Sequence, residues 1–341
     1  MGTMPGTASR RPDPTGWRDA IPGDGIAIDA GTGGRRPDGA FRMSAVERRL
    51  RAPKSLAWVI TVAAVLAGCA SPMPNTGNQR VTGGPIVFTH VGHGEPTVVL
   101  QSGLGDGRDP WAPVLNALRA EHSVFAYDRP GYGDSTATPP TPRNPCGIAT
   151  ELHGLLQSAG IKPPYVLVGH SIGGLYQYAF SRLYPDEVAG IVLVDATHPL
   201  HLRKMQVEVP VMANMLDSMS RRVFRGMMQA EFLQQQDCID TLWQKPRPDV
   251  PVRVLTRTVY SPMETASGFE SMVHGLEPNW LPLVGGKEIQ PVAGSGHYIQ
   301  RDKPEVVTKA IEEVVQEARE RGHPSAPGAA LRSPAGARPA R

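Results

Sequence analysis

The chain has 341 residues, of which 35 are basic and 32 are acidic, and its formal net charge is +3. No basic stripe with interleaved aromatic residues is present, so the sequence argues against nucleic acid as a partner. Residues 1–42 and 319–341 are rich in Gly, Pro and Arg and poor in apolar periodicity. We therefore expect a disordered or wrongly included extension at one end and a disordered tail at the other. About 240 residues remain, a usual length for one large α/β domain.

Residues 43–69 have the parts of a secretory signal peptide. A basic flank precedes an apolar run at 56–67, which is too short to span a bilayer comfortably. The run leads into Leu-Ala-Gly-Cys, ending at Cys69, which resembles the lipobox of bacterial lipoproteins. The resemblance implies export, lipid attachment to Cys69 and anchoring at the outer face of the bacterial cell membrane. An ordinary membrane anchor and a cleaved signal with an incidental Cys are the alternatives.

Export has two further consequences for the chain. Signal peptides begin near the amino terminus, so we expect translation to start at Met43, and we expect residues 70–83 to be a linker after the anchor. Outside the cytosol, Cys146 and Cys238 can form a disulfide, but the sequence is equally compatible with two buried thiols.

Strand and helix patterns alternate in the domain that we expect at 84–318. Continuous apolar runs predict strands at 85–91, 97–101, 124–127, 165–168 and 191–194. Apolar residues at helical spacing predict helices at 111–120, at 148–160 and after Gly174. This alternation is typical of a mostly parallel sheet with helices on both faces.

A sharp turn is predicted where the run at 165–168 ends. Gly169, Ser171 and Gly173 follow it with the spacing G-x-S-x-G. In this motif the small flanking residues let the backbone turn from strand to helix, which exposes the Ser hydroxyl at the carboxyl edge of the sheet. The positive amino end of the following helix faces that hydroxyl. A glycine-rich turn found by chance is the alternative, but the strand before the motif and the helix after it favour Ser171 as a nucleophile.

The strand at 97–101 ends in a loop with three glycines, at positions 103, 105 and 107. Such a loop lets backbone N–H groups approach a ligand closely, and it follows a strand predicted to lie beside the nucleophile strand. We therefore predict an oxyanion hole made by the N–H groups of Leu104 and Ile172. A flexible turn without this role is the alternative.

Residues 198–250 interrupt the alternation with a Met-rich helical pattern. A segment of this length between two strands is expected to be a lid over the site, and Met side chains suit apolar or variable substrate groups. For any single Met, simple core packing is the favoured alternative. Beyond this segment, strands are predicted at 252–256 and 288–293, and the second leads through a Gly-flanked His297 to a final helix from Pro304.

The combined motifs resemble the α/β-hydrolase fold superfamily over about 84–318. They are G-H-S-I-G-G at 169–174, which includes the sharp turn at Ser171 (the elbow), D-R-P-G-Y-G at 128–133, S-G-L-G at 102–105 and S-G-H-Y-I at 295–299. The resemblance implies an α/β-hydrolase fold, with a mostly parallel central sheet, helices on both faces and a helical lid. It also implies the chain order nucleophile, acid, base, in which Ser171 is the nucleophile and His297 the general base.

The resemblance implies cleavage of a small carboxylic ester or acyl substrate through an acyl-enzyme, without cofactor or metal. Acyl transfer, amide or peptide cleavage and cofactor-free haloperoxidase chemistry use the same residues and remain alternatives. So does a binding lipoprotein that has kept the fold without the chemistry. A serine at the elbow argues against haloalkane dehalogenase and epoxide hydrolase activity, which need a carboxylate nucleophile.

The acid is the least defined member of the set. Its usual place is the loop after the penultimate strand, but no Asp occurs between Pro251 and His297. Asp195, at the end of the strand that follows the elbow helix, is the position used by some members of the superfamily, and we favour it. Glu264 and Glu270 remain open as alternatives.

Overall fold

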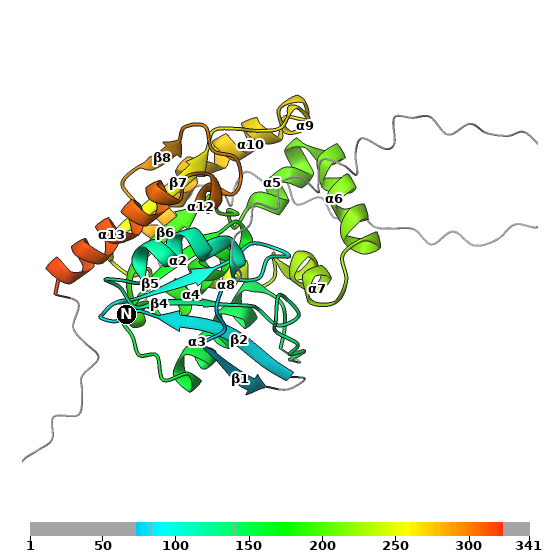
Figure 1. Ribbon diagram of the computed structural model, residues 1–341. Helices are drawn as coiled ribbons and strands as arrows, with labels where there is room; N and C mark the ends of the chain where they lie inside the picture. Colours follow the sequence, from blue (N-terminus) through cyan, green and yellow to red (C-terminus); the bar gives the residue numbers. More distant parts are fainter. Residues whose placement is uncertain (1–72, 82–83, 140, 323–341) are drawn as a thin grey trace, which may run out of the picture. The chain divides into compact units, whose positions relative to one another are not determined.

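The computed structural model describes residues 73–81, 84–139 and 141–322, which form an eight-stranded sheet flanked by helices (Figure 1). The strands are β1 (Gly77–Val81), β2 (Gly84–Val91), β3 (Thr97–Gln101), β4 (Val124–Tyr127), β5 (Tyr165–His170), β6 (Val188–Val194), β7 (Val252–Arg257) and β8 (Ile289–Val292). Their order across the sheet is β1-β2-β4-β3-β5-β6-β7-β8. The pairs β1–β2 and β2–β4 are antiparallel, whereas the five remaining pairs are parallel.

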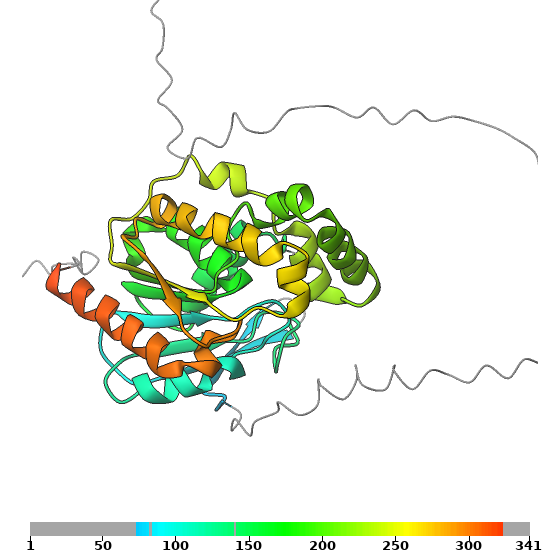
Figure 2. The same cartoon turned by 90° about the horizontal axis from the view of Figure 1, so that it is seen from above.

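Helices cover both faces of the sheet, as Figure 2 shows from above. Side chains of α3 (Pro145–Ser158) and α4 (Ile172–Leu183) pack on one face, and those of α2 (Ala112–Leu118) and α13 (Pro304–Glu320) on the other. The central strands β5 and β6 are buried along their whole length. Burial on both faces explains why their sequences are apolar without alternation, and the predicted α/β architecture is confirmed.

Four helices lie between β6 and β7, in the segment expected to be a lid. They are α5 (His201–Glu208), α6 (Pro210–Arg222), α7 (Gly226–Gln234) and α8 (Ile239–Leu242). Met205, Val209 and Met212 from this insertion form a small separate core with Met272 of α10 (Phe269–Leu276). A disulfide between Cys146 and Cys238 joins the start of α8 to α3, so of the two possibilities left open by the sequence the structure has the bridge.

The remaining elements are short. They are η2 (Asp109–Trp111), η3 (Pro185–Glu187), α9 (Pro262–Ala266), η4 (Glu277–Asn279), α11 (Trp280–Val284) and α12 (Ile299–Asp302). Within the described ranges, no helix combines the length and the apolar character needed to cross a membrane.

Two boundaries differ from the sequence-based expectation. The segment 70–83, expected to be a linker, contains β1, which pairs with β2 at the edge of the sheet. Its residues are mostly exposed and polar, so backbone pairing rather than an apolar run defines this strand. At the other end, α13 continues to Glu320, two residues past the expected end of the domain at 318. The expectations for 1–42 and 43–69, Met43 and Cys69 included, lie outside the described residues.

Candidate active site

Ser171 lies in the turn between β5 and α4, with a positive φ of 55°. This conformation is strained for a non-glycine residue and is typical of an exposed nucleophile. The turn closes tightly on the neighbouring strand: a Cβ added to Gly173 would lie 2.4 Å from the carbonyl oxygen of Gln101. Only glycine fits there, and the turn therefore holds the Ser171 hydroxyl at the carboxyl edge of the sheet.

His297 follows β8 and lies between Ser171 and Asp195. The Ser171 hydroxyl donates to its Nε2 over 3.1 Å, and its Nδ1 donates to Oδ2 of Asp195 over 2.5 Å. These roles follow from the hydrogen-bond network, because a carboxylate can only accept. The side chain of His297 is 37% exposed and that of Asp195 is 7% exposed. The imidazole is thus partly exposed to solvent, whereas the carboxylate that accepts its hydrogen bond is buried.

Asp195 occupies the turn at the end of β6, with a φ of 43°. Its N–H donates to Leu255 of β7, and its Oδ1 accepts from the N–H of Arg257. Burial alone would raise the pKa of this carboxyl, but the hydrogen bond and charge of His297 and the charge of Arg257 outweigh burial and lower it. Asp195 is therefore ionised and able to accept from the imidazole.

The other two candidate acids have different partners. Glu264 pairs with Arg257 over 3.0 Å and closes a capping box with Ser261 at the start of α9. Glu270 accepts a hydrogen bond from the Thr265 hydroxyl over 2.7 Å. Of the three carboxylates, Asp195 is the one that the structure brings to His297.

His170, the neighbour of Ser171, contacts the site without joining the chain of hydrogen bonds from Ser171 through His297 to Asp195. Its Nε2 donates to the carbonyl oxygen of His297 over 2.8 Å. Burial, followed by the charge of His297, lowers the pKa of His170 to about 3, so its ring is neutral. It therefore helps to hold the backbone that carries the imidazole.

The two predicted oxyanion donors flank Ser171. Ile172 is the first residue of α4, where helix N–H groups have no partner inside the helix. The loop with Leu104 lies against Ser171, since a Cβ added to Gly103 would be 3.2 Å from the Cβ of Ser171. Within the part of the chain that the structure describes, neither donor N–H has a hydrogen-bond partner. Both are available to a ligand, and their oxyanion role stays a prediction.

Arg257 is a residue of this site that the sequence analysis did not identify. Its Nε lies 3.4 Å from Oδ2 of Asp195, and its guanidinium carbon lies 4.1 Å from the centre of the Tyr260 ring. It ends β7, a strand predicted from its apolar residues, and nothing in that pattern indicated that its side chain turns toward the end of β6.

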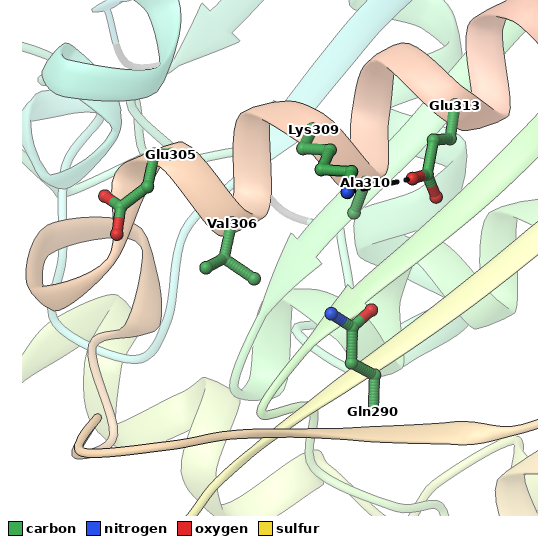
Figure 3. A pocket seen from close by; sticks show the side chains of 6 residues that line it. All are labelled: Gln290, Glu305, Val306, Lys309, Ala310 and Glu313. Carbon is green, nitrogen blue, oxygen red and sulfur yellow. Dashed lines mark ion pairs between the residues drawn. The ribbon is translucent and has the colours of Figure 1, made fainter.

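A separate pocket lies between β8 and α13 (Figure 3). Its lining residues are Gln290, Glu305, Val306, Lys309, Ala310 and Glu313. Lys309 and Glu313 form an ion pair across one helical turn, and the lining contains no nucleophile or histidine. Within the described ranges, no group of three or more His, Cys, Asp or Glu side chains is arranged to hold a metal.

Comparison with known proteins agrees with this architecture. A family model described as alpha/beta hydrolase fold matches residues 96–236. The chain is 30% identical to YqjL, an uncharacterised protein of Bacillus subtilis (strain 168), over 33% of this chain and 49% of YqjL. It is 36% identical to RutD of Klebsiella pneumoniae (strain 342), provisionally named a carbamate hydrolase, over 30% of this chain and 38% of RutD. The chain thus spans half or less of these curated relatives.

A solved structure from Acinetobacter baumannii AYE, provisionally named a lipase, superimposes with a TM-score of 0.54 at 18% identity. The superposition covers 72% of this chain and 92% of the other. At a sequence identity this low, the superposition supports only a shared fold. With the matching family model and the sheet order described above, the chain has the α/β-hydrolase fold.

Proposed function

We propose that the protein is a serine hydrolase that cleaves carboxylic esters through an acyl-enzyme intermediate. The observation that carries the proposal is the continuous chain of hydrogen bonds from Ser171 through His297 to Asp195. Each member has the chemistry that its place requires: a hydroxyl at a strained turn, a half-exposed imidazole and a buried, ionised carboxylate.

In the first half of the reaction, the Ser171 oxygen attacks the ester carbonyl carbon while His297 Nε2 takes the hydroxyl proton. The carbonyl oxygen gains negative charge, which the N–H groups of Leu104 and Ile172 stabilise. The tetrahedral species then collapses, the bond to the alcohol oxygen breaks, and His297 returns the proton to the departing alcohol.

In the second half, water replaces the alcohol. The water oxygen attacks the acyl carbon while His297 takes a proton from the water. His297 then gives that proton to the Ser171 oxygen as the carboxylic acid leaves. Asp195 keeps Nδ1 protonated throughout, so that Nε2 faces the serine, and it stabilises the transient imidazolium.

The substrate class that we propose is a small ester with an apolar acyl group. Methionines of the insertion between β6 and β7 adapt to apolar groups of variable shape. The same residues can also perform acyl transfer, haloperoxidase chemistry or the cleavage of amides, peptides or carbamates. The name of RutD points to carbamates, but only for that relative. A serine at the elbow disfavours the epoxide route, which needs a carboxylate nucleophile.

Turnover of p-nitrophenyl acetate, butyrate and octanoate, compared between the wild type and Ser171→Ala, tests the proposal. Turnover of at least one ester that disappears in the variant is the expected result. A folded wild-type protein with no Ser171-dependent ester turnover would contradict it. Labelling by a fluorophosphonate then distinguishes an enzyme for another acyl bond, which reacts at Ser171, from a binding protein, which does not.

We also propose that the protein is exported and anchored to the membrane by a lipid on Cys69. The lipobox-like sequence supports this, and so does the Cys146–Cys238 disulfide, because disulfides persist in oxidising compartments. Growth with an alkyne-tagged fatty acid should label the wild type at the membrane. Label that persists in Cys69→Ala would overturn the assignment.

A further inference from the structure

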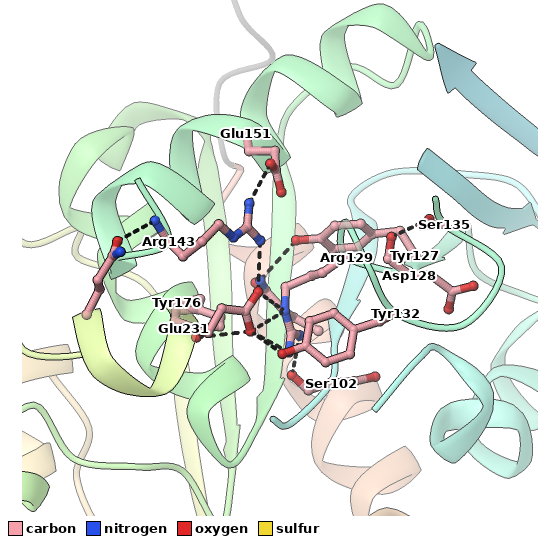
Figure 4. Close-up of polar contacts among 12 residues, drawn as sticks. Ser102, Tyr127, Asp128, Arg129, Tyr132, Ser135, Arg143, Glu151, Tyr176 and Glu231 are labelled. Atoms are coloured by element: carbon pink, nitrogen blue, oxygen red, sulfur yellow. Dashed lines mark hydrogen bonds and ion pairs between the residues drawn. The ribbon is translucent and has the colours of Figure 1, made fainter. Parts of the chain in front are cut away.

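A buried cluster of charges contacts the backbone of the glycine-rich loop at Ser102 and Gly103 (Figure 4). It consists of Arg129, Arg143, Glu151 and Glu231, and each side chain is at most 7% exposed. The residues come from the turn after β4, the segment before α3, α3 itself and α7. Two cations and two carboxylates balance in charge, and the cluster joins the sheet to the helical insertion.

Arg129 holds the glycine-rich loop by its backbone. Its Nη1 donates to the carbonyl oxygen of Ser102 and its Nη2 to that of Gly103, each over 2.7 Å. Its Nε faces the Glu231 carboxylate at 3.2 and 3.3 Å. The rigid, planar guanidinium thus fixes two successive carbonyls from one side and is itself fixed from the other.

The second of these carbonyls belongs to the peptide that also carries the Leu104 N–H. A peptide unit is planar and trans, so its C=O and N–H point in opposite directions. Holding the Gly103 carbonyl on Arg129 therefore aims the Leu104 N–H away from Arg129. Because Gly103 also lies against the Cβ of Ser171, the direction of this N–H decides whether it can meet a developing oxyanion.

Glu231 ties this arrangement to the insertion between β6 and β7. Its side chain is fully buried on α7 and accepts hydrogen bonds from Arg129, Arg143, Tyr132 and Tyr176. If α7 moved away, Arg129 and Arg143 would lose their shared anion inside the protein, which is strongly unfavourable. The hydrogen bonds from Arg129 to the glycine-rich loop therefore depend on the position of α7.

The methionines of α7 touch the same two loops. A Cβ added to Gly105 would lie 3.3 Å from the terminal methyl of Met228, and one added to Gly131 would lie 2.8 Å from Cγ of Met227. Gly105 belongs to the glycine-rich loop and Gly131 to the turn of Arg129. Side-chain packing and ion pairing thus both connect α7 to the glycine-rich loop and to the turn that carries Arg129.

We propose that Arg129 is a positioning residue that orients the Leu104 oxyanion donor, and that Glu231 makes this orientation depend on the seating of α7. The inference rests on the proposed serine-hydrolase function. It assigns the insertion a second role besides contact with substrate, since only a seated α7 completes the oxyanion hole.

The test compares Arg129→Lys and Glu231→Gln with a matched control, Arg182→Lys. Arg182 is also buried and also donates to two carbonyls, of Lys245 and Leu283, but these lie outside the oxyanion loop. The readouts are kcat and KM on p-nitrophenyl butyrate, the Ki of an alkyl trifluoromethyl ketone and the thermal midpoint. The ketone forms a tetrahedral adduct with Ser171, and the negatively charged oxygen of this adduct needs the oxyanion hole. KM, in contrast, also reports substrate contacts that do not involve the oxyanion hole.

For Arg129→Lys, we expect kcat to fall about 10- to 100-fold and the ketone Ki to rise by a similar factor, with KM nearly unchanged. Glu231→Gln should move both constants in the same direction, and it decides the case if Arg129→Lys does not fold. Arg182→Lys should lower the thermal midpoint and leave kcat and Ki unchanged. A folded Arg129→Lys or Glu231→Gln with wild-type kcat and Ki would overturn the inference, whereas an inactive wild type would contradict the proposed function instead.

Discussion

Arg257 directs its Nε at the same carboxylate oxygen of Asp195, Oδ2, that accepts the hydrogen bond from His297. The Asp195 carboxylate thus has two cationic neighbours at one oxygen when the imidazole is protonated. Glu264 lies on the far side of Arg257 and compensates part of its charge. The end of β7 therefore supplies the cation and α9 its counter-ion, whereas Asp195 comes from the turn after β6.

Replacing two of the three candidate acids, Asp195 and Glu270, separates their roles. Asp195→Asn should lower kcat about 10⁴-fold, because the amide cannot hold the imidazole in the tautomer that the serine needs. Glu270→Gln should leave kcat within about twofold, since Glu270 accepts a hydrogen bond from Thr265 and lies 3.9 Å from Nε2 of His274, both on the surface. Steady-state kinetics with p-nitrophenyl butyrate measures both. A large loss of kcat in Glu270→Gln with little loss in Asp195→Asn would show that Glu270, and not Asp195, is the acid.

Removing the charge of Arg257 should move the pH dependence. Its guanidinium helps to lower the pKa of Asp195, so Arg257→Met raises that pKa and lets the carboxyl protonate at a higher pH. The acid limb of kcat/KM against pH should shift upward. The control is Arg253→Met on the same strand, which removes an arginine paired with Glu313 and Glu317 on α13. If both variants have the wild-type acid limb, Arg257 does not tune the acid.

The elbow could be predicted from the sequence because its constraint is local. Gly169, Ser171 and Gly173 lie within five residues, between an apolar strand and a helix. The expected role of His297 followed from the family resemblance, through its place in chain order and a short Gly-flanked motif. Arg257 and the pair of Arg129 and Glu231 could not be found in this way. The last two are 102 residues apart, and only the packing of α7 on the sheet brings them together.

Buried neutral histidines should make stability fall in mild acid. Burial, followed by the charge of His201, lowers the pKa of His198 to about 3, and its Nδ1 accepts a hydrogen bond from Leu200. The unfolded chain binds a proton below about pH 6.5, whereas the folded state stays neutral to about pH 3. Between these values the unfolding free energy should drop by about 1.4 kcal/mol per pH unit for this group.

Urea unfolding of the wild type and His198→Asn from pH 7 to pH 4 measures this contribution. The variant should be less stable at pH 7, and its stability should fall less steeply with acid, because one proton-binding difference has been removed. Parallel curves for the two proteins would show that His198 is protonated in the folded state as well.

Gly173 and Gly154 differ in the space around their Cα atoms. A Cβ on Gly173 would lie 2.4 Å from the Gln101 carbonyl and 2.5 Å from that of Ser102, and both are backbone atoms that cannot move aside. Gly173→Ala should therefore push the elbow away from β3, with a loss of about 2 kcal/mol or more in stability and most of the activity. Gly154, within α3, has nothing within 4 Å of the added carbon.

Gly154→Ala is thus the matched control, and it should stabilise the protein by about 0.5–1 kcal/mol because alanine favours the helix. Thermal unfolding and fluorophosphonate labelling of both variants make the comparison. The labelling rate should fall sharply in Gly173→Ala alone, since only this variant displaces the turn that holds Ser171. Equal labelling of the two proteins would mean that the close approach of the elbow to β3 is not required to present the nucleophile.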